Sequence, residues 1–230
     1  MPHSQNTLLA HCHVRLVTEI DDAFVLESAG YPASEGATHH ALTYRQTHAP
    51  HLFLGLYVSL NDHAAIDFST LTPHVGSSGL IGFVSATAYD SPHLLPETMS
   101  THQAQATNVF IHSVCVHPQL RRQGLALALL CQFMNHLARI NQAIKGQKVH
   151  ADWLEYTTEE AIVQRSPVWN HPQSPTLVVA PESMPHDPYQ TVLLISHEYL
   201  FDLYKKAGFQ LNGRSSVIHG KVVSNVCKNL

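Results

Sequence analysis

Residues 117–130, HPQLRRQGLALALL, place two arginines and a glycine directly before an apolar stretch. The apolar positions from Ala126 onward recur every three or four residues, which predicts a helix beginning here. The first N–H groups of a helix lack partners within it, and the helix dipole adds positive potential at that end. Arg121 and Arg122 can add charge-assisted hydrogen bonds, and Gly124 permits close approach to the backbone. The segment therefore predicts a site for an anion such as a diphosphate.

Two familiar phosphate-binding patterns do not occur in this sequence. There is no Gly-x-x-x-x-Gly-Lys-Ser/Thr, and no Gly-x-Gly-x-x-Gly follows a predicted strand. These observations argue against P-loop ATPases and Rossmann dehydrogenases. The competing interpretation is that Arg121 and Arg122 are a solvated helix start and that Gly124 is a packing residue.

The stretch before this helix, NVFIHSVCVH from Asn108, is apolar on both faces and predicts a central strand. By the period of two, His112 shares a face with Phe110 and Val114, whereas Cys115 points to the other face. A histidine with an ordinary pKa near 6.5 is suited to proton transfer. An acyl-enzyme on Cys115 would lack a neighbouring base, unless a bulge reversed the facing.

Further strands and helices must position these residues. Strand patterns begin at Val14, His51, Leu80 and Thr191, and those from His51 and Leu80 predict an antiparallel pair. Helices are expected after Thr18, within 36–49 and over 197–208, where Gly208 supplies a stop. Residues 91–107 predict a loop, and residues 209–226 predict a final hairpin.

The chain is expected to form a single domain over residues 1–230. Six of the 13 prolines and both tryptophans, Trp153 and Trp169, fall within residues 141–190. This composition predicts an insertion between the helix and the next strand.

Composition narrows the classes of partner and compartment. The formal net charge is −4 and no polybasic run occurs, which disfavours nucleic acid. The longest apolar runs are about half of the roughly 20 residues that a membrane span needs. The four scattered cysteines indicate a reducing, cytoplasmic location, and the 19 histidines show no metal-ligand spacing.

Arg121-x-x-Gly124-x-Ala126 after the strand VCVHP resembles the coenzyme A signature of the GNAT acetyltransferase superfamily. The segments IHSVCVHPQLRRQGLALALL, LYKKAGFQLNGRSSVIHG and RLVTEIDDAFVLESAGYPASE resemble the serotonin (arylalkylamine) N-acetyltransferases within it. This resemblance implies an α/β fold, in which a mixed central sheet flanked by helices is split at acetyl-CoA by a bulged central strand.

The resemblance also assigns roles to residues. It implies His112 as one member of a two-histidine proton relay, with Phe110 in place of the second, and Tyr204 facing the coenzyme A sulfur. Tyr31, Pro32 and Phe110 are expected to contact substrate. The residues expected to bind acetyl-CoA are Val114, Cys115, Val116, Arg121, Arg122, Gln123, Gly124, Leu125, Ala126 and Leu127.

The leading hypothesis is a monomeric acetyl-CoA-dependent N-acetyltransferase acting by direct transfer on a small primary amine, either an arylalkylamine or a polyamine. Acidic residues such as Glu27, Glu35 or Asp90 beside the amine would favour a polyamine, and aromatic residues an arylalkylamine. Two alternatives stay open: a protein or peptide N-acetyltransferase, and an acyl-CoA-binding protein whose catalysis has decayed.

Overall fold

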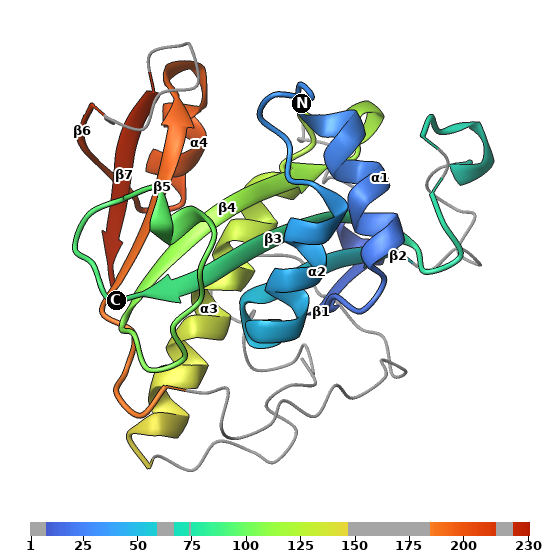
Figure 1. Cartoon of the computed structure of the whole chain (residues 1–230). Coiled ribbons are helices and arrows are strands. Elements are labelled where there is room, and N and C mark those ends of the chain that lie inside the picture. Colours follow the sequence, from blue (N-terminus) through green and yellow to red (C-terminus); the bar gives the residue numbers. More distant parts are fainter. Residues whose placement is uncertain (1–7, 59–66, 74, 147–184, 215–222) are drawn as a thin grey trace, which may run out of the picture.

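The computed structural model describes residues 8–58, 67–73, 75–146, 185–214 and 223–230 of the chain. Within them, seven strands form one mixed sheet in the order β1-β2-β3-β4-β5-β7-β6 (Figure 1). Neighbouring strands are antiparallel except for β4 and β5, which are parallel. The strands are β1 (Cys12–Leu16), β2 (Phe53–Val58), β3 (Leu80–Tyr89), β4 (Asn108–Val116), β5 (Thr191–His197), β6 (Gln210–Arg214) and β7 (Val223–Asn229).

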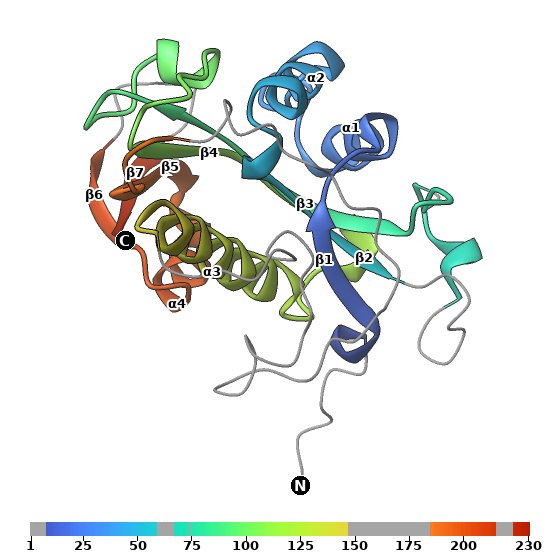
Figure 2. The ribbon, with the colours of Figure 1, turned by 90° about the horizontal axis from the view of Figure 1, so that it is seen from below.

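Helices cover both faces of the sheet. Figure 2 shows α1 (Ile20–Gly30) and α2 (His39–His48) on one face, with α3 (Leu125–Ile144) and α4 (Phe201–Lys206) on the other. The buried residues of α3 recur at helical spacing, and they pack against the sheet in the largest apolar cluster. The buried residues of α1 are only Ala23, Leu26 and Glu27, so a carboxylate lies on its inner side.

Most of the predicted elements are confirmed. The strands from His51 and Leu80 pair antiparallel, and β4 is central. The segment 91–107 contains only a short 3-10 turn, Glu97–Met99, among the described elements. β6 and β7 form an antiparallel pair, as expected of a hairpin.

Several boundaries differ from the predictions, and two of the differences concern helices. α3 continues to Ile144, beyond the residue where the insertion was expected to begin. α4 begins only at Phe201, because a 3-10 turn occupies Glu198–Leu200, and it ends before Gly208, which has a φ of +87°. Residues 147–184, with Trp153 and Trp169, lie outside the described residues, and so do 215–222 of the hairpin. None of the helices in the described ranges is long and apolar enough to span a membrane.

Candidate active site

The parallel strands β4 and β5 pair along only part of their length. Their register runs from Asn108 opposite Thr191 to Ile111 opposite Leu194. Beyond these residues the two strands diverge, as Figure 1 shows. The edge of β4 that faces β5 therefore offers backbone N–H and C=O groups that need other partners.

The Tyr31 hydroxyl satisfies one of these positions. It donates to the Val114 carbonyl oxygen at 3.1 Å and accepts from the Val114 N–H at 3.2 Å. Tyr31 follows α1, and in the same loop Glu35 Oε2 lies 3.0 Å from Nε2 of His197, the last residue of β5. This α1–α2 loop thus contacts both diverging strands, while Pro32 is exposed and its carbonyl accepts from the Glu35 and Gly36 N–H groups.

A β-bulge lies at His112. Ser85 of β3 pairs with Ser113, whereas the next residue, Ala86, pairs with Ile111. His112 is therefore the extra residue on β4. This agrees with the bulged strand that the sequence resemblance implied.

Because of the bulge, Val114 and Cys115 point to the faces of the sheet opposite to those predicted. The Ser113 hydroxyl and the Cys115 thiol both contact α1, the first through Glu27 and the second through the Leu26 carbonyl. Val114 instead packs against the cluster formed with α3, on the face opposite Phe110. The strict period of two was wrong beyond Ile111, because one additional residue shifts the alternation by one.

The His112 imidazole has one bonded and one unbonded nitrogen. Nε2 lies 2.7 Å from Oγ1 of Thr87 on β3, which in turn lies 3.3 Å from the Thr98 carbonyl oxygen. A hydroxyl has a single hydrogen, so both contacts are hydrogen bonds only if Thr87 donates to Thr98 and accepts from His112 Nε2–H. Nδ1 then carries a lone pair, and it is shielded from solvent with no hydrogen-bond partner among the described residues.

Burial lowers the pKa of His112 well below 6.5, and the nearby Arg45 guanidinium acts in the same direction. The imidazole is therefore neutral at pH 7. Neutrality is the state in which a histidine can accept a proton.

A buried carboxylate and guanidinium accompany His112. Glu27 is 2% exposed, and its Oε1 accepts from the Ala37 N–H and the Ser113 hydroxyl, both at 2.8 Å. Its Oε2 is buried without a partner among the described residues. Arg45 is 7% exposed and its Nη1 lies 3.4 Å from Ser85 Oγ.

The two buried charges influence each other. Burial raises the pKa of Glu27, although its two hydrogen bonds and Arg45 oppose the shift. Burial lowers the pKa of Arg45 to about 10, with Glu27 opposing. The sequence pointed to Glu27 only as one of three acids, and it gave no signal for Arg45, Thr87 or Ser113. The detectable sign for Glu27 was its place three and four residues after Phe24 and Ala23, which puts an acid on the inward stripe of α1.

Tyr204 lies on α4, and its ring packs edge-on against Phe209 at a centroid distance of 5.9 Å. It is buried, which raises its pKa. Burial, followed by the neighbouring Tyr204, also raises the pKa of Tyr31. Both phenols are therefore hydrogen-bond donors at neutral pH.

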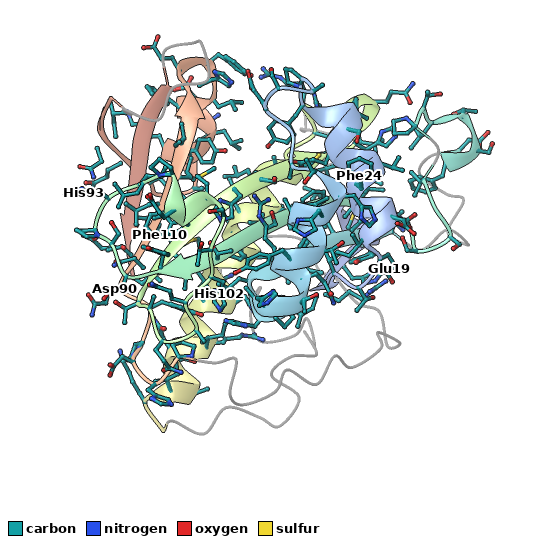
Figure 3. All side chains as sticks on the ribbon, in the orientation of Figure 1. Glu19, Phe24, Asp90, His93, His102 and Phe110 are labelled. Atoms are coloured by element: carbon teal, nitrogen blue, oxygen red, sulfur yellow. The ribbon has the colours of Figure 1, made fainter. Side chains whose placement is uncertain are left out.

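The other aromatic and acidic candidates lie in different surroundings. Phe110 is fully buried in a small cluster with Leu94 and Leu193. Asp90 is exposed at the end of β3, and Figure 3 shows it far from the helix that carries Phe24. Asp90 is thus remote from Glu27, which lies on that helix.

Cys115 is buried, and its thiol donates to the Leu26 carbonyl oxygen at 3.2 Å. Burial raises its pKa, and Glu27 acts in the same direction. The bulge turns Cys115 toward the face of His112, contrary to the prediction. The thiol is nevertheless protonated at pH 7, so it lacks the thiolate that a nucleophile needs.

The loop before α3 has the backbone geometry of an anion site. Arg122 and Gly124 have φ values of +65° and +80°, and the first helical bond joins the Ala128 N–H to the Gly124 carbonyl. The N–H groups of Leu125, Ala126 and Leu127 thus have no acceptor within the helix. Their arrangement suits an anion.

The two arginines differ in their surroundings. Arg121 donates from Nη2 to the Gly30 carbonyl at 3.1 Å and from Nε to the Val116 carbonyl at 3.4 Å, which ties the loop to α1 and β4. Arg122 is exposed. Among the described residues, no group of three or more His, Cys, Asp or Glu could hold a metal ion.

No family model matches the sequence, and no curated protein matches it. Solved structures do match. The loading GNATL domain of CurA from Lyngbya majuscula aligns over 95% of this chain and 97% of its own, with 11% identity and a TM-score of 0.58. The GphF GNAT-like decarboxylase in complex with isobutyryl-CoA aligns over 94% and 98%, with 13% identity and a TM-score of 0.57.

The NatC complex bound to Gag peptide and CoA aligns over 96% of this chain and 99% of the matched chain, with 10% identity and a TM-score of 0.56. At such identities the similarity concerns the fold. The chain therefore has the GNAT fold, with a central strand that bulges at His112 and diverges from its neighbour beyond Ile111.

Proposed function

We propose that this protein is an acetyl-CoA-dependent N-acetyltransferase that acts on a small primary amine by direct transfer. One observation carries the proposal: the bulged, diverging strand β4 is followed, after the loop 117–124, by a helix whose first N–H groups lack internal acceptors. Acetyl-CoA carries a diphosphate and an arm that ends in the thioester. The helix start suits the diphosphate, and the strand edge suits the arm. Similarity to CoA-bound structures of the same fold supports this cosubstrate.

The residues present fit the cosubstrate. The backbone from Arg122 to Leu127 would bind the diphosphate. The edge of β4 at Val114–Val116 would pair with the amide-containing arm in place of its present contacts with Tyr31 and Arg121. Gly124 has a left-handed φ and nothing nearer to an added Cβ than Leu9 Cδ1 at 3.9 Å. Space beside it is therefore open, and glycine is required by the backbone conformation.

The chemistry requires a neutral amine. An alkylammonium with a pKa of about 10.4 must lose a proton at a cost of roughly 4.6 kcal/mol at pH 7. Neutral His112 supplies an acceptor for a proton of the amine. As the N–C bond forms and the C–S bond breaks, the Tyr204 hydroxyl donates a hydrogen bond to the developing thiolate.

The α1–α2 loop would contact the amine through Tyr31 and Pro32, and Phe110 on β4 is the third residue proposed to contact it. The acceptor is an arylalkylamine or a polyamine, and the enzyme works as a cytoplasmic monomer. A peptide N-terminus is the second candidate acceptor, because the NatC complex, whose matched chain has a similar fold, was solved with a bound peptide.

The test measures free thiol released from acetyl-CoA with tryptamine, serotonin, spermidine and a short peptide. We expect release with at least one small amine, and its loss in a His112→Ala, Tyr204→Phe double variant that still binds coenzyme A. Release equal to that of the double variant for every acceptor would overturn the enzyme proposal. Coenzyme A binding without any turnover would instead favour a binding protein, and release with the peptide alone would favour the second candidate.

A further inference from the structure

We propose that Glu27 binds the ammonium group of the substrate and takes its proton. In this chain Phe110 stands in place of the second histidine of the relay, so His112 is the only histidine of that pair. The inference rests on the proposed function and adds a catalytic residue from α1. It names a substrate that arrives as a cation. The second acceptor for the same ammonium is His112 Nδ1.

Glu27 Oε2 is the only carboxylate oxygen among the described residues that is buried without a hydrogen-bond partner. An unpaired buried carboxylate oxygen is costly, because a charged group loses its hydration without replacement. The remainder of the side chain is fixed, since Oε1 holds the Ala37 N–H and the Ser113 hydroxyl at 2.8 Å each. Oε2 is thus a positioned acceptor that lacks a donor.

The bulge brings this acceptor to the same face as His112. Ser113, which holds Glu27, is the residue after His112, and both side chains are directed toward the α1–α2 layer. His112 Nδ1 is the other unpartnered buried acceptor here, given that Nε2–H is donated to Thr87. Arg45 influences the pKa of both Glu27 and His112, and its Nη1 lies 3.4 Å from Oγ of Ser85, the residue of β3 that pairs with Ser113.

An alkylammonium matches this pair of acceptors. It has three N–H donors, so in this proposal one hydrogen bond goes to the carboxylate oxygen and another to the imidazole lone pair. Three titratable groups interact electrostatically with the Glu27 carboxylate: Arg45 from α2, Tyr31 from the α1–α2 loop and Cys115 from β4. The Arg45 charge and the loss of water both disfavour the ammonium form, which promotes proton transfer.

The proton transfer is balanced as follows. The ammonium gives one proton to Glu27, which leaves a neutral amine and a carboxylic acid. The amine nitrogen bonds to the acyl carbon, the C–S bond breaks, and the second proton of the nitrogen passes to His112. One of the two protons ends on the released thiol, and the other goes to solvent.

The matched pair of variants is Glu27→Gln and Glu19→Gln. Glutamine keeps the carbonyl oxygen that accepts from Ala37 and Ser113, and it replaces the unpaired oxygen with an amide nitrogen. Glu19, the residue that precedes α1, serves as the control, because Arg15 and the Tyr57 hydroxyl occupy both of its oxygens. Figure 3 shows Glu19 well separated from Phe110.

For Glu27→Gln we expect kcat/KM for the amine to fall on the order of 100-fold at pH 7. The deficit should shrink as the pH approaches the pKa of the amine, because neutral amine needs no acceptor. Coenzyme A affinity should stay at the wild-type value, and Glu19→Gln should retain wild-type turnover. Wild-type kcat/KM in Glu27→Gln at pH 7, or a deficit that is the same at every pH, would overturn the role of Glu27.

A second measurement uses the unaltered protein. Calorimetric titration of tryptamine or spermidine into coenzyme A-saturated protein, in buffers of different ionisation enthalpy, gives the protons released on binding. With Glu27 as the acceptor, we expect almost no net release at pH 7 for tryptamine. Release of about one proton for each tryptamine bound would show that the site accepts only neutral amine and would overturn the proposal. Amine binding without turnover would contradict the proposed enzyme while leaving this measurement valid.

Discussion

At the scale of single residues, burial determines which side chains of the candidate site can accept a proton and which cannot. Burial with Arg45 keeps His112 neutral, whereas burial keeps Cys115 and Tyr204 protonated. These opposite effects follow from one rule, since a low-dielectric site favours the uncharged form of each group. Among the described residues, His112 Nδ1 and Glu27 Oε2 are buried without a hydrogen-bond partner, and by the same rule burial raises the pKa of Glu27.

Replacing Cys115 with alanine should leave acetyl transfer nearly intact. The thiol is protonated and donates to the Leu26 carbonyl oxygen, so it is not a nucleophile. We expect turnover within about threefold of wild type, and no acetyl adduct on Cys115 by mass spectrometry after incubation with acetyl-CoA alone. An adduct, or a tenfold loss of turnover in a variant of normal thermal stability, would indicate an acyl-enzyme.

Replacing Tyr31 with phenylalanine should strengthen coenzyme A binding. The hydroxyl occupies both backbone groups of Val114, so a ligand that pairs with this edge must displace it. Neutral hydrogen bonds contribute about 1 kcal/mol each, so losing one or both should raise the affinity by roughly 5- to 30-fold. Calorimetry on the variant measures this change.

The control for Tyr31 is Tyr44→Phe. Tyr44 lies on α2, and its hydroxyl accepts from the His102 backbone N–H rather than from a residue assigned to coenzyme A. We expect its affinity for coenzyme A to equal that of wild type. Weaker binding by Tyr31→Phe would instead mean that this hydroxyl contacts the coenzyme directly.

At the scale of secondary-structure elements, α2 depends on its first residue. Thr38 is the N-cap, and its hydroxyl accepts from the Ala41 N–H at 3.1 Å. Thr38→Ala should lower the free energy of unfolding by about 1 kcal/mol, whereas Thr38→Ser should retain it. Urea unfolding of the two variants provides the comparison, and equal stabilities would show that the cap is dispensable.

The sequence was informative where local pattern determines structure. The apolar run of β4, the glycine at 124 and the three-and-four spacing of α3 predicted the strand, loop and helix in their observed order. The bulge at His112 left no trace in this pattern, because it depends on how β3 pairs with β4. For the same reason the facing of Val114 and Cys115 was predicted wrongly.

In the candidate site too, some residues could be identified from the sequence, whereas others depend on contacts between distant elements. His112 and Tyr204 were identified through resemblance, and their roles remain predictions. Arg45 and Thr87 come from elements distant in sequence, and they join His112 only through packing of α2 and β3. No spacing within one element could have predicted such a group. Glu27 was detectable as an acid on the inner side of α1, but its unpaired oxygen was not.

At the scale of the whole molecule, buried histidines connect the sheet, α3 and the segment before β5. His51 Nε2 lies 2.8 Å from the Tyr189 hydroxyl, and His136 Nε2 donates to the His51 carbonyl oxygen at 2.7 Å. Asn141 bonds to both the N–H and the carbonyl of Tyr189. These polar contacts lie in fully buried surroundings, so their stability depends on neutral imidazoles.

Mild acid should therefore lower the free energy of unfolding before exposed carboxylates titrate. Burial lowers the pKa of His51 to about 3 and that of His136 to about 4, while both return to about 6.5 on unfolding. Above pH 6.5 neither state binds these protons. Below it only the unfolded chain does, so the free energy of unfolding falls as the pH drops from 6.5 toward 4. Each of the two histidines should cost about 2 kcal/mol at pH 5.

His136→Gln tests this origin of acid sensitivity. The glutamine amide can still donate to the His51 carbonyl oxygen but cannot take up a proton in the unfolded chain. Urea unfolding at several pH values between 5 and 7.5 should give a shallower pH dependence for the variant, by about one proton. Glu27, whose pKa is raised by burial, works in the opposite direction and is common to both proteins. Parallel curves for the two proteins would show that the acid sensitivity arises from other groups.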